Sequence, residues 1–70
     1  MRPDEILDEL RQLAREWRAA QAAHRQMRDQ LREEGNEEEA ARVGWGAYML
    51  GYCATDLERL IRRVEERLRG

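Results

Sequence analysis

Apolar residues recur every three or four positions along this chain, in two long runs separated by Gly35 and Asn36. A spacing that averages 3.5 residues lines up side chains on one stripe of an α-helix and is typical of coiled coils and helical bundles. Seven of the eight repeat positions are apolar in the first run, with a histidine as the exception, and all eight are apolar in the second. The first run is Ile6, Leu10, Leu13, Trp17, Ala20, His24, Met27 and Leu31, and the second is Val43, Ala47, Leu50, Ala54, Leu57, Ile61, Val64 and Leu68.

This pattern predicts an all-α protein, an antiparallel two-helix hairpin with helices at about 3–34 and 37–69. Residues 1–70 form a single helical-hairpin domain. A chain of this length buries only about 60% of its unfolded surface, so a stable fold needs very good packing or a partner.

The break between the runs carries the residues that end and start helices. Gly35 adopts the backbone conformation of a helix C-cap without steric cost. Asn36 is a favourable N-cap, and Glu39 three residues later completes a capping box. A second capping-box pattern, Thr55-Asp56-Leu57-Glu58, leaves open an alternative in which the second helix breaks near 51–55 and the chain forms three helices.

Composition excludes several classes of protein. The chain has 13 basic and 15 acidic residues and a net charge of −2. Because the two signs are interleaved, no basic face for nucleic acid is expected. The longest uncharged run has 13 residues, too short to span a bilayer, and the N-terminus lacks the apolar segment of a signal peptide. These features predict a soluble, cytoplasmic-type protein.

That uncharged run, 43–55, contains three glycines within a helical pattern: Gly44, Gly46 and Gly51. Each costs roughly 0.5–1 kcal/mol relative to alanine in a helix. Glycines are useful there only if another helix backbone or a flat ligand comes close. Both readings stay open, because small residues at heptad spacing also allow two helices to approach without any ligand.

The same run is apolar on all sides, which is normal only for a helix that is surrounded. Trp45, Tyr48, Met49 and Tyr52 lie outside the predicted seam and are expected to be interface residues. The simplest way to bury them is a homodimer that forms an antiparallel four-helix bundle.

Folding the hairpin at 35–36 places residues opposite each other when their numbers sum to about 71. His24 then faces Gly46 and Ala47, Met27 faces Gly44, and Ala20 faces Leu50. The small residues around the histidine predict a site for a flat hydrophobic ligand, with haem or another metalloporphyrin as the candidate cofactor and His24 as its axial ligand. The site comprises His24, Met27, Gly44, Gly46, Ala47, Leu50 and Gly51. The alternative is a core or interface histidine bonded to a tyrosine, to Gln21 or to its symmetry mate.

No catalytic residue is expected, and an enzyme is the least favoured class. Cys53, the single cysteine, excludes an internal disulfide and a multi-cysteine zinc site and is predicted to be a small buried hydrophobe. A nucleophilic cysteine needs a nearby base, and His24 lies roughly 10 Å away by helix rise.

Two segments resemble computationally designed helical bundles and helical repeats: Leu31-Arg32-Glu33-Glu34-Gly35-Asn36-Glu37-Glu38-Glu39-Ala40, and the charged-apolar repeat from Asp56 to Leu68. The resemblance covers about half of the chain and implies a self-associating, de novo designed bundle. Residues 17–27 and 43–55 depart from that style, so a designed function would lie there. A natural phage or bacterial interaction protein, regulatory and without a cofactor, is the alternative.

Overall fold

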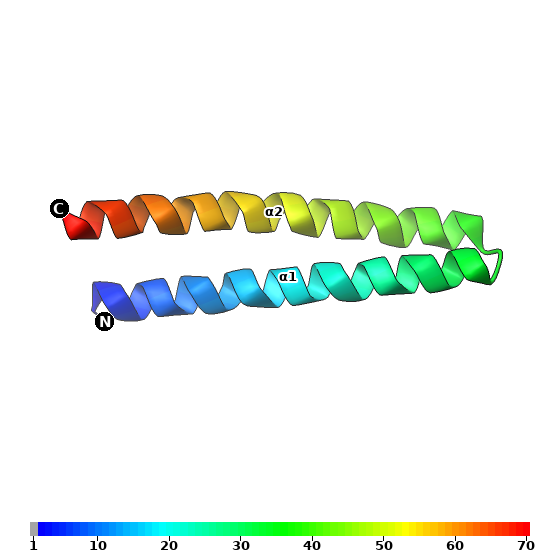
Figure 1. Ribbon diagram of the computed structural model, residues 1–70, viewed down its shortest axis with the longest axis horizontal. Coiled ribbons are helices and arrows are strands. Elements are labelled where there is room, and N and C mark those ends of the chain that lie inside the picture. Colours follow the sequence, from blue (N-terminus) through cyan, green and yellow to red (C-terminus); the bar gives the residue numbers. More distant parts are fainter. Residues whose placement is uncertain (1) are drawn as a thin grey trace.

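The computed structural model describes residues 2–70 and shows two long antiparallel helices, α1 (Pro3–Glu33) and α2 (Glu37–Arg69), with both termini at one end (Figure 1). The hairpin measures 53 × 16 × 13 Å. This confirms the predicted all-α hairpin to within one residue at each helix end. α2 continues through 51–55, so the three-helix alternative is wrong. The Thr55 hydroxyl donates to Gly51 O, 2.9 Å away, and does not cap a new helix.

The turn between the helices is a Schellman motif followed directly by an N-cap. Gly35 has a φ of 81°, and its N–H donates to Arg32 O at 3.0 Å. The Asn36 N–H donates to Leu31 O at 2.8 Å, and the Asn36 side chain accepts from the Glu39 N–H at 3.4 Å. Because Leu31 O already occupies the Asn36 N–H, the predicted capping box forms in one direction only.

The core between the helices is thin. Four of the seven buried apolar residues are alanines, and among the described residues no large side chain is fully buried. Alanines bring the two helices close but remove little apolar surface from water. The seven are Leu7, Ala14, Ala40, Ala47, Ala54, Leu57 and Ile61.

The seam of α1 differs from the predicted stripe. Buried positions recur every seven residues at Leu7, Ala14 and Gln21, one residue later than half of the predicted positions. Ile6 and Met27 are consequently 45% and 52% exposed. α1 is therefore rotated so that Ile6 and Met27 lie at the edge of the seam, whereas Leu10, Leu13 and Trp17 still pack, partly buried, against the core.

Leu68 is a further correction, since it is 51% exposed although the repeat places it in the core. It lies in the last turn of α2, beside the N-terminal end of α1, where few side chains remain to cover it (Figure 1).

The rotation gives the hairpin two unlike sides. Take any buried seam residue i of either helix. Residues i−1 and i+3 then lie on one side of the hairpin, and residues i+1 and i+4 lie on the other. We call the first side the apolar flank; it comprises Ile6, Leu10, Leu13, Trp17, Ala20 and Met27 of α1 and Leu50, Cys53, Leu57 and Leu60 of α2. We call the second side the polar flank; it includes Arg11, Arg18, Arg25, Gly51, Thr55, Glu58 and Glu65.

Candidate functional site

Two ion pairs join the helices across the polar flank. Arg11 Nη2 lies 2.6 Å from Glu65 Oε2, and Arg18 Nη2 lies 2.7 Å from Glu58 Oε1. Arg18 Nε also donates to Glu58 Oε2 at 3.1 Å, so this second pair is bidentate. The pairs lie one heptad apart on each helix and together fix the rotation of α1 against α2.

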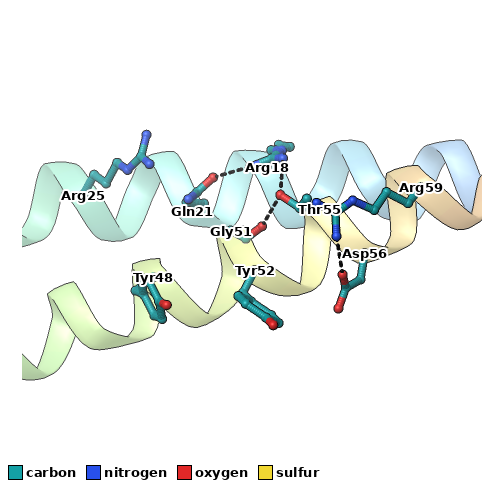
Figure 2. A pocket seen from close by; sticks show the side chains of 9 residues that line it. All are labelled: Arg18, Gln21, Arg25, Tyr48, Gly51, Tyr52, Thr55, Asp56 and Arg59. Carbon is teal, nitrogen blue, oxygen red and sulfur yellow. Dashed lines mark hydrogen bonds and ion pairs between the residues drawn. The ribbon is translucent and has the colours of Figure 1, made fainter.

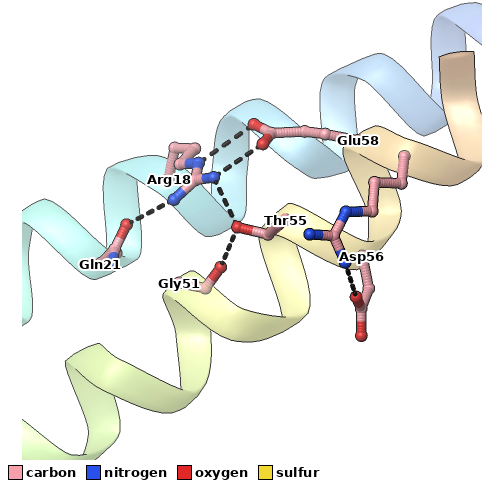
Figure 3. A network of polar contacts seen from close by, with 7 residues as sticks. Arg18, Gln21, Gly51, Thr55, Asp56 and Glu58 are labelled. Atoms are coloured by element: carbon pink, nitrogen blue, oxygen red, sulfur yellow. Dashed lines mark hydrogen bonds and ion pairs between the residues drawn. The ribbon is translucent and has the colours of Figure 1, made fainter.

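Arg18 is the centre of a larger polar network (Figure 3). Its guanidinium also donates to Thr55 Oγ1 at 3.2 Å and to Gln21 Oε1 at 3.0 Å. Hydrogen bonding to Arg18 holds the pKa of Glu58 below its usual value and raises the pKa of Arg18. Gln21 is buried, and no buried side-chain polar atom of the described residues lacks a partner.

The two interhelical ion pairs form the start of a series at seven-residue spacing, which we call the ion-pair ladder. This ladder stops at Gly51. Continuing the heptad spacing of Arg11 and Arg18 leads to Arg25, and continuing that of Glu65 and Glu58 leads to Gly51. A glycine thus stands where the pattern calls for an acidic residue. The Gln21 amide occupies the space instead, and a Cβ on Gly51 would overlap its nitrogen.

The other two glycines of α2 are covered in the same way. A Cβ on Gly44 would lie 3.0 Å from Arg28 Cδ, and a Cβ on Gly46 would lie 3.3 Å from His24 Cδ2. The residue numbers of the three facing pairs sum to 70 or 72, against the predicted sum of about 71, so the predicted register is confirmed to within one residue. The prediction that Met27 faces Gly44 is wrong, because the rotation of α1 turns Met27 outward and brings Arg28 over the glycine.

His24 is held in one orientation by its own helix. Its Nδ1 lies 2.8 Å from Ala20 O, so in the neutral ring the Nδ1–H donates and Nε2 carries the free lone pair. Metal-ligating histidines are commonly oriented by such a bond to a backbone carbonyl. Of the predicted site, the structure brings His24 and Gly46 together, buries Ala47 and half-buries Leu50, whereas Gly44 and Gly51 lie on the other flank under polar side chains.

The four predicted interface residues are all exposed on the outer surface of α2. Trp45 and Tyr48 stack with ring centroids 5.5 Å apart, and Tyr52 follows 6.4 Å from Tyr48. These three form an aromatic strip on the outer surface of α2. Met49 is 41% exposed and lies one helical turn from Trp45 and Tyr52 on the same outer surface, at the edge nearer to the apolar flank.

The strip borders an open depression of about 530 Å³ (Figure 2). Tyr48 and Tyr52 of α2 and Arg18 and Arg25 of α1 are among the residues that line it, and the Arg25 side chain points away from α2. This groove lies where the ion-pair ladder ends, and sequence reasoning missed it. The signal was present as arginines at a seven-residue spacing, Arg11, Arg18, Arg25 and Arg32, opposite acidic residues that match only the first two.

Cys53 is exposed, which corrects the prediction that it is buried. It lies with Trp17, Leu57 and Leu60 in a shallow depression of about 400 Å³ on the apolar flank. The thiol faces outward because the buried heptad position belongs to its neighbour, Ala54.

Residues 2–70 contain neither a cluster of several metal-ligating side chains nor a membrane-spanning helix. No cluster of three or more His, Cys, Asp or Glu side chains there could hold a metal ion. Neither described helix is long and apolar enough to cross a membrane. No protein-family model matches the chain, and neither a curated protein nor a solved structure is significantly similar to it.

The contact between Gly51 and Gln21 predicts opposite effects of alanine at two glycines. Gly44→Ala should stabilise the protein by up to about 1 kcal/mol, because only the flexible Arg28 side chain must move. Gly51→Ala should destabilise it by about 1 kcal/mol or more, because the buried Gln21 amide must leave the Arg18 network. Urea unfolding followed by circular dichroism measures both. In a Gln21→Ala background, Gly51→Ala should become stabilising; if it stays harmful, the contact is not the cause.

The lowered pKa of Glu58 predicts a pH-dependent contribution to stability. A carboxylate with a folded-state pKa below its unfolded value contributes fully above the unfolded pKa and loses that contribution as pH falls through the folded pKa. Glu58→Gln should therefore lower the melting temperature at pH 7, and the difference from wild type should shrink below about pH 4.5, the usual glutamate value. Glu66→Gln, exposed on the same helix, is the control. A difference independent of pH would exclude the Arg18 pair as its source.

Proposed function

We propose that this protein is a self-associating helical hairpin that pairs with a second copy through its apolar flank, as a homodimeric four-helix bundle. The observation that carries the proposal is the exposure of apolar residues along the full length of one side. Ile6 is 45% exposed, Met27 52% and Leu60 42%, and Trp17 and Cys53 border the shallow depression between them.

The thin core supports the same proposal. A seam built mainly of alanine, with no large side chain fully buried among the described residues, gives a single hairpin little hydrophobic stabilisation. A second copy supplies a flank of matching length and apolar character, and a twofold arrangement buries each flank against the other. The polar flank, with its ion pairs, faces solvent in such a dimer.

The proposal also covers the origin of the protein, as a designed bundle or a natural one. A designed bundle is supported by the loop and charge patterns described above and by the agreement between local signals and fold. The alternative, a natural helical interaction protein, is supported by the aromatic strip of Trp45, Tyr48 and Tyr52, which the proposed dimer leaves exposed.

A second candidate function is axial ligation of a metalloporphyrin by His24. The supporting observation is the bond from Nδ1 to Ala20 O, which leaves Nε2 as the free nitrogen of an imidazole lying over Gly46. Gln21 and Arg28 cover Gly51 and Gly44, so of the three glycines only Gly46 lies against the imidazole itself.

Charge placed on the apolar flank should break the dimer. Met27 is 52% exposed in the hairpin, so burying the rest of it contributes about 0.8–1.5 kcal/mol in each copy, and its replacement by glutamate should raise the dissociation constant at least about tenfold. Gln26→Glu, which adds the same charge at the next position on the exposed outer side, should leave it unchanged. Sedimentation equilibrium measures both. A wild-type protein that stays at 8.3 kDa at high concentration would refute self-association.

Haemin titration tests the second candidate. Wild-type protein should shift and sharpen the Soret band, His24→Ala should abolish the shift, and Gln26→Ala should preserve it. An unchanged spectrum in wild type, or a shift that survives in His24→Ala, would eliminate His24 as an axial ligand.

A further inference from the structure

We infer that the second copy docks on the apolar flank with its loop at the opposite end, so that α2 lies against the second copy's α2 and the two Cys53 side chains meet on the twofold axis. This inference rests on the proposed self-association and specifies its geometry. In this geometry, Leu60 of the second copy covers Gly46.

Two twofold arrangements bury the same flank. If the axis runs along the helices, both loops lie at one end and α1 faces α2 of the second copy. If the axis crosses the helices, the loops lie at opposite ends and each helix faces its own counterpart, antiparallel. Neighbouring helices are antiparallel in both arrangements, so helix dipoles do not distinguish the two. The side chains that meet across the interface have to distinguish them.

On the apolar flank of α2, the residues that point most directly away from the hairpin are spaced seven apart, each one position before a heptad position of the seam. We call such a set a column; in α2 it is Glu39, Gly46, Cys53, Leu60 and Arg67. An antiparallel copy of this column centred on Cys53 sets Leu60 against Gly46 and Glu39 against Arg67. A large apolar side chain then meets a position without a side chain, and an acidic residue meets a basic one. Each match occurs twice because of the symmetry.

The corresponding column of α1 is centred on Ala20. An antiparallel copy about this residue sets Leu13 against Met27, two apolar side chains of which the second is 52% exposed in the hairpin, and sets Ile6 against Glu34, the one unmatched contact of this column. Ala20 lies level with Cys53 to within about two residues, given that Gln21 covers Gly51 and His24 covers Gly46. One axis can therefore pass through the small residues of both columns.

The arrangement with both loops at one end matches charges less well. It sets Glu34 against Glu39 and Glu16 against Asp56, two like-charge contacts, with Glu9 near Arg63 as a favourable one. The opposite-end arrangement has one like-charge contact, Arg42 with Arg63. That contact is weakened because Arg42 already pairs with Glu38 and Glu39 at 3.3 and 2.8 Å.

Distances permit a disulfide at the axis. Helices packed about 8–10 Å apart, each with Cα atoms about 2.3 Å from its axis, leave about 3.5–5.5 Å between Cα atoms that face each other. Disulfides span about 4.4–6.8 Å between Cα atoms. In the same-end arrangement Cys53 faces Ala20 instead, and the two thiols lie on diagonal helices beyond this range.

Oxidation with diamide tests the orientation. Two Cys53 thiols give up two protons and two electrons to diamide, which becomes the hydrazine, and an S–S bond joins the copies. Non-reducing electrophoresis measures the yield for wild type and for Ala20→Cys in a Cys53→Ala background, which probes the other helix. Ala19→Cys in the same background, one residue away on the exposed outer side, is the control for random collision. Light scattering under reducing conditions gives the mass of every variant.

Both probes should cross-link at least about tenfold faster than the control, because a docked pair of thiols has a millimolar effective concentration. A dimeric mass without cross-linking above the control at both positions would overturn the orientation and leave the proposed function intact. A monomeric mass for wild type would overturn both.

Discussion

The bidentate contact between Arg18 and Glu58, repeated one heptad away by Arg11 and Glu65, determines the character of the hairpin. Each pair is partly exposed, and such pairs contribute little to net stability. Their effect is geometric. They hold the arginine side of α1 against α2 in an arrangement that leaves Ile6 and Met27 half-exposed at the edge of the seam. The thin alanine core, the exposed apolar flank and the polar flank all follow from that arrangement.

The glycines of α2 have different meanings on the two flanks. Gly51 interrupts the ion-pair ladder and receives the Gln21 amide, and Gly44 receives the Arg28 stem, so neither holds space for a ligand within the hairpin. Gly46 lies on the other side, beside His24, where the hairpin provides no further cover. A helix weakened by three glycines is therefore explained in two places by packing within the chain. At the third, the His24 ring packs over Gly46.

Helix number, helix ends and register could be predicted from the sequence because they depend on local signals: the 3.5-residue repeat, Gly35 and Asn36. The rotation of α1 could not, because the repeat scored only apolar residues and treated arginines as a solvated surface. Ile6, Leu13, Ala20 and Met27 fit a 3.5-residue stripe whether that stripe faces the second helix or a second molecule. Arg11 and Arg18 decide between these, and their role depends on Glu58 and Glu65, about 40 to 54 residues later in the chain.

An apolar stripe turned out of a hairpin seam has a cost unless something covers it. If the stripe of α1 had faced α2, Met27 and Ile6 would be buried and the arginines would extend into solvent without strongly held partners. The observed rotation exposes those two side chains to about half of their surface and gains two ion pairs that are individually weak. In the proposed dimer, covering the exposed half of a large side chain would contribute about 0.8–1.5 kcal/mol without giving up the ion pairs. The proposed self-association would thus make favourable a rotation that is unfavourable for one hairpin.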